Sequence, residues 1–330
     1  MGTTANNWGL IGHEWAVDLL ASRLASGRIG HAYLFTGSPG AGRRTLALRF
    51  AQALNCTGDA PPCGQCRACD LIARGAHPDV QVIAPEGRTL KIEQVRDLQH
   101  DLTLAPVEAR YRVAILEDMQ AATDQAADAL LKTLEEPPGA TRLLLTADSV
   151  DNVRPTIVSR CQVVPLRPVP ARTLSAALVQ RYGLPVEEAN TLARLAAGRP
   201  GWAIAAAEDP AIVERHREVV GELLGLLRAD RTGRFNASER IARDEALPFI
   251  LETWQSVWRD VLHVVEDSSV LTVNADHQDE LTALARDVSA EQARRALYAV
   301  RRTIAALEKY ANTRLALDLM LLDLPYLQPQ

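Results

Sequence analysis

The chain has no long hydrophobic run, and this absence already limits what it can be. Nowhere in its 330 residues do about eighteen apolar residues follow one another without interruption. Its first residues also lack the basic segment and apolar core of a signal peptide. Basic residues are not in excess, since the formal net charge is -5. We therefore expect a cytoplasmic protein whose contacts with nucleic acid are local or shared with partners.

Cysteine is scarce, and its distribution is uneven. The chain has 5 cysteines, and four of them form the pattern C-x6-C-x2-C-x2-C between residues 56 and 69. Such a set is a poor disulfide framework for a chain of this length, and a reducing cytosol favours metal binding instead. Four thiolates can close a tetrahedron around Zn²⁺ and leave no position for water, which predicts a structural zinc knuckle. Coincidental free cysteines are the alternative. The predicted ligands are Cys56, Cys63, Cys66 and Cys69.

A glycine-rich turn at residues 37–45 lacks the lysine that a phosphate loop normally carries. The turn follows an apolar run and opens a helical pattern, which is the context that a P-loop requires. In that register Arg43 replaces the lysine, Arg44 replaces the Mg²⁺-binding Ser or Thr, and Thr45 comes one position late. A planar guanidinium does not substitute for a compact ammonium, so we interpret the loop as degenerate. An ordinary turn without a ligand is the alternative, and passive ATP binding is left open. The residues assigned to this loop are Gly37, Gly40, Gly42, Arg43, Arg44 and Thr45.

An acidic pair, Glu117-Asp118, follows the apolar run at 113–116. In nucleotide-hydrolysing proteins of this arrangement an Asp comes first to organise Mg²⁺, and a Glu follows to polarise water. The order is reversed here, and a misplacement of about 1 Å can reduce a rate roughly a hundredfold. Two defects in one site predict a core that has kept its shape and lost hydrolysis. A solvated acidic pair at the end of a strand is the alternative.

The distribution of apolar residues predicts the fold class. Short apolar runs at 32–35, 80–83, 113–116 and 143–146 alternate with helical stretches at 45–54, 91–102 and 124–134, which is typical of a parallel sheet covered on both faces. A proline-rich segment at 164–170 predicts a linker, and the sequence beyond it is Ala/Leu-rich with helical periodicity. We expect an α/β core at 1–165, a small helical domain at 166–210 and a helical domain at 211–330.

Five motifs occur together in the order found in one family. They are Gly12–Glu14, Gly30–Phe35, Ala129–Pro138, Pro155–Gln162 and Gly198–Gly201. The chain resembles bacterial clamp-loader subunits of the AAA+ class in these motifs, in the glycine-rich turn and in the four cysteines. The resemblance implies an AAA+ P-loop-type core with an inserted zinc knuckle, a small helical lid domain and an all-α collar domain that mediates oligomerisation. The degenerate loop, the reversed acidic pair and the end at Gln330 without a long tail favour a non-hydrolysing subunit over the gamma/tau motor subunit.

The resemblance also assigns a role to Arg160. In this family the arginine of the Ser-Arg-Cys motif projects into the nucleotide site of the adjacent subunit, where it can stabilise charge on the terminal phosphate. The residue types alone would favour a surface or helix-capping arginine. The charges of Lys132, Glu135 and Glu136 indicate a solvated helix face, which the resemblance places at an interface or in the central chamber.

The resemblance implies a clamp-loader component of the DNA polymerase III holoenzyme, a DNA-directed DNA polymerase and nucleotidyltransferase complex. It would have no ATPase activity of its own. The resemblance implies gamma/tau and delta subunits as partners in a heteropentamer, which loads the sliding clamp onto primed DNA during replication. An active gamma/tau-like ATPase and a zinc-dependent DNA-binding module are the alternatives.

Overall fold

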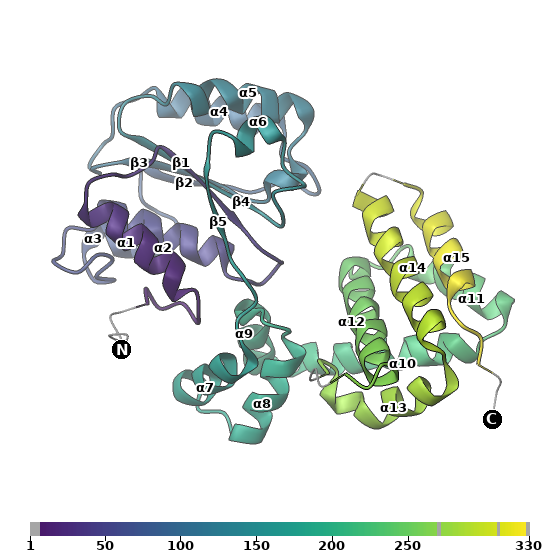
Figure 1. Cartoon of the computed structure of the whole chain (residues 1–330). Helices are drawn as coiled ribbons and strands as arrows, with labels where there is room; N and C mark the ends of the chain where they lie inside the picture. The colour runs from purple at the N-terminus through teal and green to yellow at the C-terminus, as the bar shows by residue number, and fades with distance from the viewer. Residues whose placement is uncertain (1–6, 269–271, 309–310, 328–330) are drawn as a thin grey trace. The chain divides into compact units, whose positions relative to one another are not determined.

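The computed structural model describes residues 7–268, 272–308 and 311–327, which form two compact units (Figure 1). The first unit takes in the chain up to Ala177 together with the turn Gly198–Trp202. The second contains residues 178–197 and the chain from Ala203 onward. The expected boundaries at 165 and 210 stay a prediction. In the described ranges, no helix combines the length and apolarity needed to cross a membrane.

The first unit is built on a five-stranded parallel sheet in the order β2-β3-β4-β1-β5. Every residue of β1 and β3 is buried, as expected of central strands covered on both faces. The strands are β1 (Ala32–Thr36), β2 (Val80–Ile83), β3 (Arg112–Leu116), β4 (Thr141–Ala147) and β5 (Gln162–Pro165).

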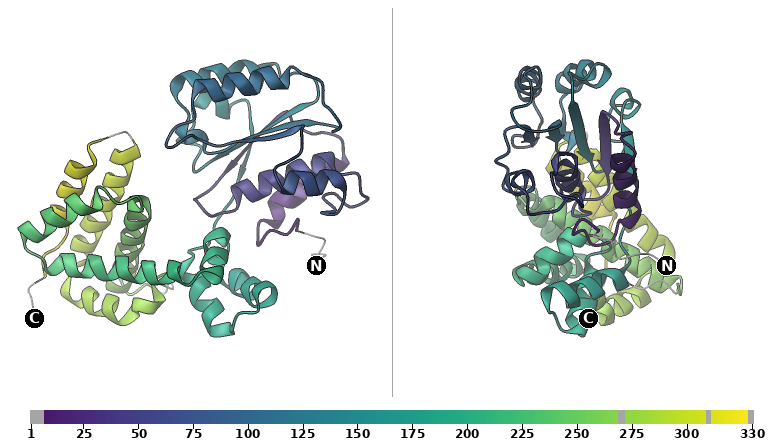
Figure 2. Two further views of the ribbon diagram at one scale, coloured as in Figure 1. Left: turned by 180° about the vertical axis from the view of Figure 1, so that it is seen from behind. Right: turned by 90° about the vertical axis from the view of Figure 1, so that its left-hand side faces the viewer.

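Helices cover both faces of this sheet, as Figures 1 and 2 show. Tyr33 and Phe35 of β1 pack with the apolar sides of α1 and α2, whereas Leu34 of the same strand packs with α4 and α5. This alternation follows from the pleat of the strand. One face carries α1 (Glu14–Ala25), α2 (Arg43–Asn55) and α3 (Arg67–Ala73); the other carries α4 (Ile92–Leu102), α5 (Asp124–Glu135) and α6 (Pro155–Val158).

The predicted α/β fold class is confirmed, and one strand was missed. Strand β5 pairs with β1 over residues that the sequence assigned partly to a motif and partly to the linker at 164–170. Of its four residues only Val164 is buried, so neither an apolar run nor a regular alternation was present to indicate a strand.

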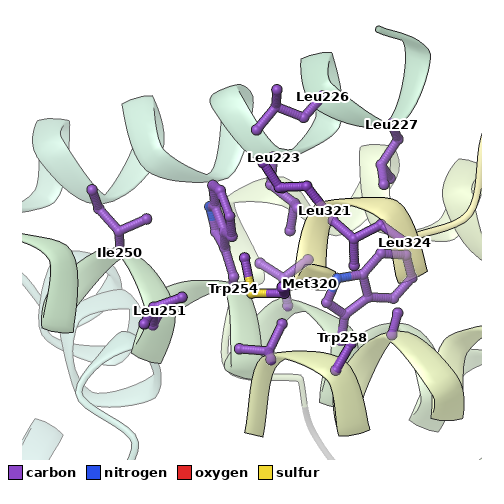
Figure 3. Packing of buried hydrophobic residues seen from close by; sticks show 14 of the residues in the cluster. Leu223, Leu226, Leu227, Ile250, Leu251, Trp254, Trp258, Met320, Leu321 and Leu324 are labelled. Atoms are coloured by element: carbon purple, nitrogen blue, oxygen red, sulfur yellow. The ribbon is translucent and has the colours of Figure 1, made fainter. Parts of the chain in front are cut away.

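The second unit is helical, and two tryptophans form the centre of its core. Trp254 and Trp258 of α12 are fully buried, and Figure 3 shows them among leucines of α10 and the end of α15. The indole Nε1 of Trp254 donates to the Val219 carbonyl at 3.0 Å, which satisfies a buried polar group. From Ala211 onward the helices are α10 (Ala211–Arg228), α11 (Arg231–Ile241), α12 (Leu247–Val265), α13 (Gln278–Asp287), α14 (Ala290–Glu308) and α15 (Thr313–Asp323). The remaining helices are α7 (Ala171–Tyr182), α8 (Val186–Leu195) and α9 (Pro200–Glu208).

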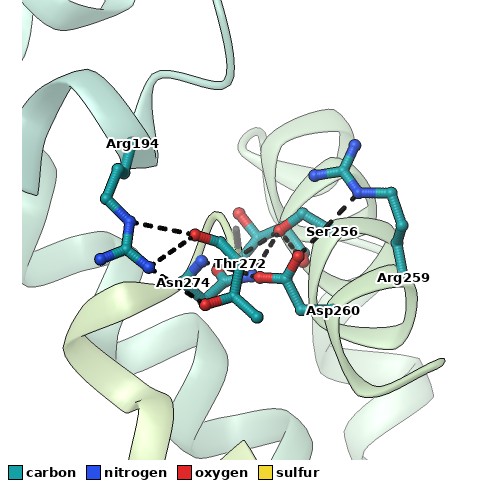
Figure 4. Close-up of polar contacts among 7 residues, drawn as sticks. Arg194, Ser256, Arg259, Asp260, Thr272 and Asn274 are labelled. Carbon is teal, nitrogen blue, oxygen red and sulfur yellow. Dashed lines mark hydrogen bonds and ion pairs between the residues drawn. The ribbon is translucent and has the colours of Figure 1, made fainter. Parts of the chain in front are cut away.

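Buried polar groups fix the loop that precedes α13. Asp260 is buried, and its Oδ2 accepts hydrogen bonds from the backbone N–H and the side chain of Asn274 at 2.8 and 2.7 Å (Figure 4). Arg194 of α8 donates to the Thr272 carbonyl at 3.1 and 3.2 Å. These bonds tie the segment around residue 273 to two helices of the same unit.

Candidate phosphate site and metal centre

The glycine-rich turn joins the end of β1 to the start of α2. Gly37 has a φ of 153°, and a Cβ there would lie 2.7 Å from the Leu166 carbonyl oxygen, so a side chain has no room. The Gly40 carbonyl accepts the N–H of Gly201 at 2.8 Å. The Ala41 carbonyl oxygen lies 2.9 Å from the Nε2 atom of His13. Contacts from two other parts of the unit therefore hold the turn in place.

Both arginines after the turn are paired with the acidic residues after β3. Arg43 Nη2 donates to Asp118 Oδ1 at 3.1 Å, and the Arg43 side chain is only 12% exposed. Arg44 Nε lies 2.6 Å from Glu117 Oε1, an ion pair without the alignment of a hydrogen bond. The site thus neutralises its own charges, in the place where a working P-loop would present a lysine and a metal-binding hydroxyl to a phosphate.

Asp118 is held in a defined position. It has a φ of 51° and lies in the left-handed region, which Asp tolerates better than most residues. Its backbone N–H donates to Thr146 Oγ1 at 3.0 Å, and Gln120 Nε2 donates to its Oδ1 at 3.1 Å. Thr45, by contrast, is exposed on the first turn of α2 and does not take part in this network.

Trp8 and Ile11 precede α1, where their side chains can either flank an adenine or pack inside the unit. Both are buried, and the Trp8 ring stacks on Phe50 with a centroid distance of 6.2 Å. Trp8 belongs to the apolar cluster of α1 and α2.

Arg160 lies just after α6, next to the end of α5. Its side chain is 34% exposed, and its Nη2 is 2.5 Å from Glu135 Oε1. Its Nη1 donates to the Thr156 carbonyl at 2.9 Å. The sequence placed Glu135 on a charged helix face and gave no sign of this pairing, because 25 residues separate the two side chains. The neighbouring Cys161 is partly buried, and burial raises its pKa to about 12.

The structure brings the four clustered cysteines together. Their sulfur atoms all lie within 4.8 Å of one another, and those of Cys56 and Cys66 are 4.0 Å apart. A tetrahedral zinc site with bonds of about 2.3 Å places its sulfur atoms about 3.8 Å apart, so the spacing fits such a site. The N–H of Cys63 points at the Cys56 sulfur at 3.3 Å, and the N–H of Cys66 points at the Cys63 sulfur at 3.3 Å. All four are free thiols that could bind a metal ion.

The protonation of these thiols is not uniform. Burial alone would raise the pKa of Cys66, but backbone hydrogen bonds from Thr57 and Cys69 outweigh it and lower the pKa to about 5. Burial raises the pKa of Cys69, which lies fully inside the unit. A cation bound at this cluster would have to displace the proton of Cys69, whose pKa burial raises.

Comparisons with known proteins find similarity to subunits of DNA polymerase III. The family model described as DNA polymerase III, delta subunit, matches residues 12–170. The chain is 29% identical over 267 residues to the delta-prime subunit of Bacillus subtilis, covering 80% of this chain and 79% of that protein. It is 38% identical over 189 residues to the delta-prime subunit of Pseudomonas aeruginosa, covering 56% and 57%. It is 40% identical over 154 residues to the tau subunit of Escherichia coli, covering 46% and 24%. The match thus spans less than two thirds of the Pseudomonas and Escherichia proteins.

The sheet order, the glycine-rich turn after β1 and the acidic pair after β3 define an α/β core of the P-loop type, the core of AAA+ proteins. Together with the family match, this core confirms the resemblance found in the sequence. The family model and the two delta-prime relatives support a delta-prime-like subunit of the DNA polymerase III clamp loader.

Proposed function

We propose that this subunit does not hydrolyse ATP and instead supplies Arg160 to the nucleotide site of a neighbouring gamma/tau ATPase subunit. The observation that supports the absence of hydrolysis is the pairing of Arg43 with Asp118 and of Arg44 with Glu117. A bound Mg²⁺-nucleotide would have to displace both arginines from the carboxylates that the metal needs. The displaced guanidinium groups would then occupy the positions where a working P-loop has its lysine and its metal-binding hydroxyl.

The second half rests on the position of Arg160. Its guanidinium is partly exposed, at the end of a short helix, and its partner Glu135 is itself 52% exposed. An exposed ion pair of this kind contributes little to stability, so a phosphate can replace the carboxylate at small cost. A guanidinium supplied from a neighbouring subunit can be worth about 10³ to 10⁵ in rate, because it stabilises the charge that develops on the transferred phosphoryl group.

The experiment uses the complex reconstituted with gamma/tau and delta subunits, the sliding clamp and primed DNA. Arg160→Ala should leave assembly intact and lower DNA-stimulated ATP hydrolysis. Arg160→Lys should restore only part of it, because an ammonium lacks the planar fork. Arg154→Ala is the matched control, since Arg154 lies at the other end of α6 and pairs with Asp128 at 2.7 Å. Unchanged turnover in the Arg160→Ala complex would contradict the proposed role.

The isolated chain should not turn over ATP. Turnover that Glu117→Gln abolishes would instead favour an active ATPase. Salt-sensitive DNA binding by the chain alone, lost in Cys66→Ser, would favour a nucleic-acid-binding module.

We propose Zn²⁺ as the ion of the cysteine cluster, which we call the zinc knuckle. Four thiolate donors with this spacing suit Zn²⁺ better than the hard cations, which prefer oxygen. Metal analysis of the purified chain should give one ion per chain.

A further inference from the structure

The sheet of the first unit has an open edge at β2, because this strand pairs only with β3. The carbonyl groups of Asp79 and Ile83 accept hydrogen bonds from β3, so the odd-numbered residues of this segment face their neighbour. The backbone N–H and C=O groups of successive strand residues point to opposite sides of the strand. Those of the even-numbered residues therefore point away from β3.

The backbone groups at both ends of this open edge already have hydrogen-bond partners. The N–H of Val80 donates to the His77 carbonyl at 3.1 Å, and the Ala84 carbonyl accepts Gln94 Nε2 at 2.9 Å. Between them lies Val82, whose N–H and carbonyl have no protein partner in the described part of the chain. A free donor and a free acceptor on one edge residue are what an added strand needs to pair with a sheet.

A groove of about 860 Å³ runs along this edge, a volume in the range of sites that hold ligands. Its two walls come from helices on opposite faces of the sheet, α2 and α3 on one side and α4 on the other. Leu48 and Ile72 make one wall apolar, and Asp97 and Asp101 of α4 make the other acidic.

The pleat of β2 assigns the two walls to alternate residues. Val80 and Val82 pack with the cluster of α1 and α2, whereas Gln81 donates to Asp101 on the α4 side at 2.8 Å. A peptide residue placed opposite Val82 would therefore point its side chain toward the apolar wall. The residues before and after it would point toward α4.

The charge of the groove is not balanced. The arginines on the apolar side already have partners, since Arg44 pairs with Glu117 at 2.6 Å and Arg74 with Asp70 at 2.9 Å. Asp97 and Asp101 have no cationic partner over the ranges that the structure describes. The α4 wall thus carries two carboxylates that a cationic side chain can neutralise.

We propose that the open edge of β2 binds an extended basic segment of a partner protein, which adds one strand to the sheet. The segment has an apolar, preferably β-branched residue opposite Val82, with Lys or Arg on either side facing Asp97 and Asp101. Backbone hydrogen bonds to Val82 supply the docking, and the alternation of apolar and basic residues supplies the selectivity. The proposal concerns a surface separate from Arg160 and the phosphate loop, and it does not depend on the proposed function.

The probe is an N-acetylated, C-amidated hexapeptide of alternating Lys and Val, and titration calorimetry with the full chain measures its binding. The same peptide with Glu in place of Lys should not bind. Val82→Pro removes the outward N–H, and proline is accepted on an edge strand because that N–H makes no bond within the sheet. Loss of the bond should weaken binding about tenfold, whereas Val82→Ala, which keeps the N–H, should change it by less than about threefold.

The acidic wall has its own test. Asp97→Asn combined with Asp101→Asn should weaken binding of the Lys/Val peptide roughly tenfold at low salt and by less at high salt. If Val82→Pro does not fold, N-methylation of every backbone N–H of the peptide removes the peptide donors instead, and the unaltered chain should then bind about tenfold more weakly.

Four results would overturn the proposal. They are equal binding of the Lys and Glu peptides, no binding of either, binding that neither Val82→Pro nor peptide N-methylation weakens, and self-association of the chain that Val82→Pro abolishes. The last result would identify the occupant as a second copy of this chain.

Discussion

The phosphate loop and the zinc knuckle lie in the same α/β unit, yet their polar groups are arranged in opposite ways. In the loop, Arg43 and Arg44 each have a carboxylate partner from the end of β3. In the knuckle, four sulfur atoms converge, and the backbone N–H groups of Cys63 and Cys66 point at two of them. The first arrangement is complete without a ligand. The second gathers donors that a cation would satisfy.

This difference gives a physical criterion for a degenerate site. A missing motif residue shows only that one contact is lost, and a ligand can still bind through the remaining ones. Carboxylates neutralised by the chain's own arginines predict in addition that any ligand must compete with these internal ion pairs. The criterion predicts that the two regions respond differently when their partners are changed.

The largest effect should come from the zinc knuckle. Cys69 is fully buried, and Cys69→Ser would remove one of the four ligands of the proposed zinc site, whose metal would supply folding free energy. We expect a loss of several kcal/mol in the stability of the α/β unit and loss of the bound metal, since structural zinc contributes about 10–16 kcal/mol in isolated zinc fingers. Thermal unfolding and metal analysis measure both.

Cys161→Ser is the matched control for this variant, because Cys161 lies outside the cluster. It should keep the full metal content. Equal metal content and equal unfolding temperatures for the two variants, or a chelator-treated chain as stable as the untreated one, would show that the cysteines do not form a structural site.

The next effect concerns the phosphate loop. Restoring the P-loop residues with Arg43→Lys and Arg44→Thr, together with Glu117→Asp and Asp118→Glu, removes both guanidinium groups and puts the acidic pair in the usual order. Binding of Mg²⁺-ATP should then tighten at least about tenfold, which corresponds to about 1.4 kcal/mol. Fluorescence titration with a labelled ATP analogue measures the change.

Arg96→Lys controls for the exchange of an arginine, since Arg96 is exposed on α4. Tight Mg²⁺-ATP binding by the unaltered chain would break the comparison, because the loop would then accept the ligand despite its internal ion pairs.

The sequence predicted the framework well because its signals are local. The apolar run at 80–83 became β2 with the same bounds, and the helix expected from Thr45 begins two residues earlier, at Arg43. The difference arises because Gly42, with a φ of 102°, occupies the N-cap position and lets the helix start directly after the turn. Strand β5 carried no such signal, since three of its four residues are exposed.

The chemistry of the site could be predicted only in part. Motif spacing indicated that the loop lacked its lysine, but the pairing of Arg43 with Asp118 joins residues 75 positions apart. The contact between Gly201 and Gly40 likewise depends on tertiary structure. Sequence periodicity reports which face of a helix is buried and does not report which charges meet across the fold.

The smallest effect concerns His13, which supports the phosphate loop through the Ala41 carbonyl. His13 is buried, and burial lowers its pKa below 6.5 despite opposing contributions from Ala41 and Glu14. The unfolded chain therefore takes up a proton at a higher pH than the folded chain. Stability should fall as the pH drops below about 6.5 and continue to fall until the pKa of the folded state is reached.

His13→Gln keeps an amide donor for the Ala41 carbonyl and removes the titration. The free energy of unfolding, measured by denaturant between about pH 7.5 and 5.5, should therefore depend less on pH in this variant. Asp79 does not interfere, because three backbone N–H groups outweigh its burial and lower its pKa below 3.8, so its own contribution is lost only in stronger acid. Equal pH dependence in the two chains would show that His13 takes up its proton as readily in the folded loop as in the unfolded chain. The loop would then have one more group open to solvent, and its contrast with the zinc knuckle would be weaker.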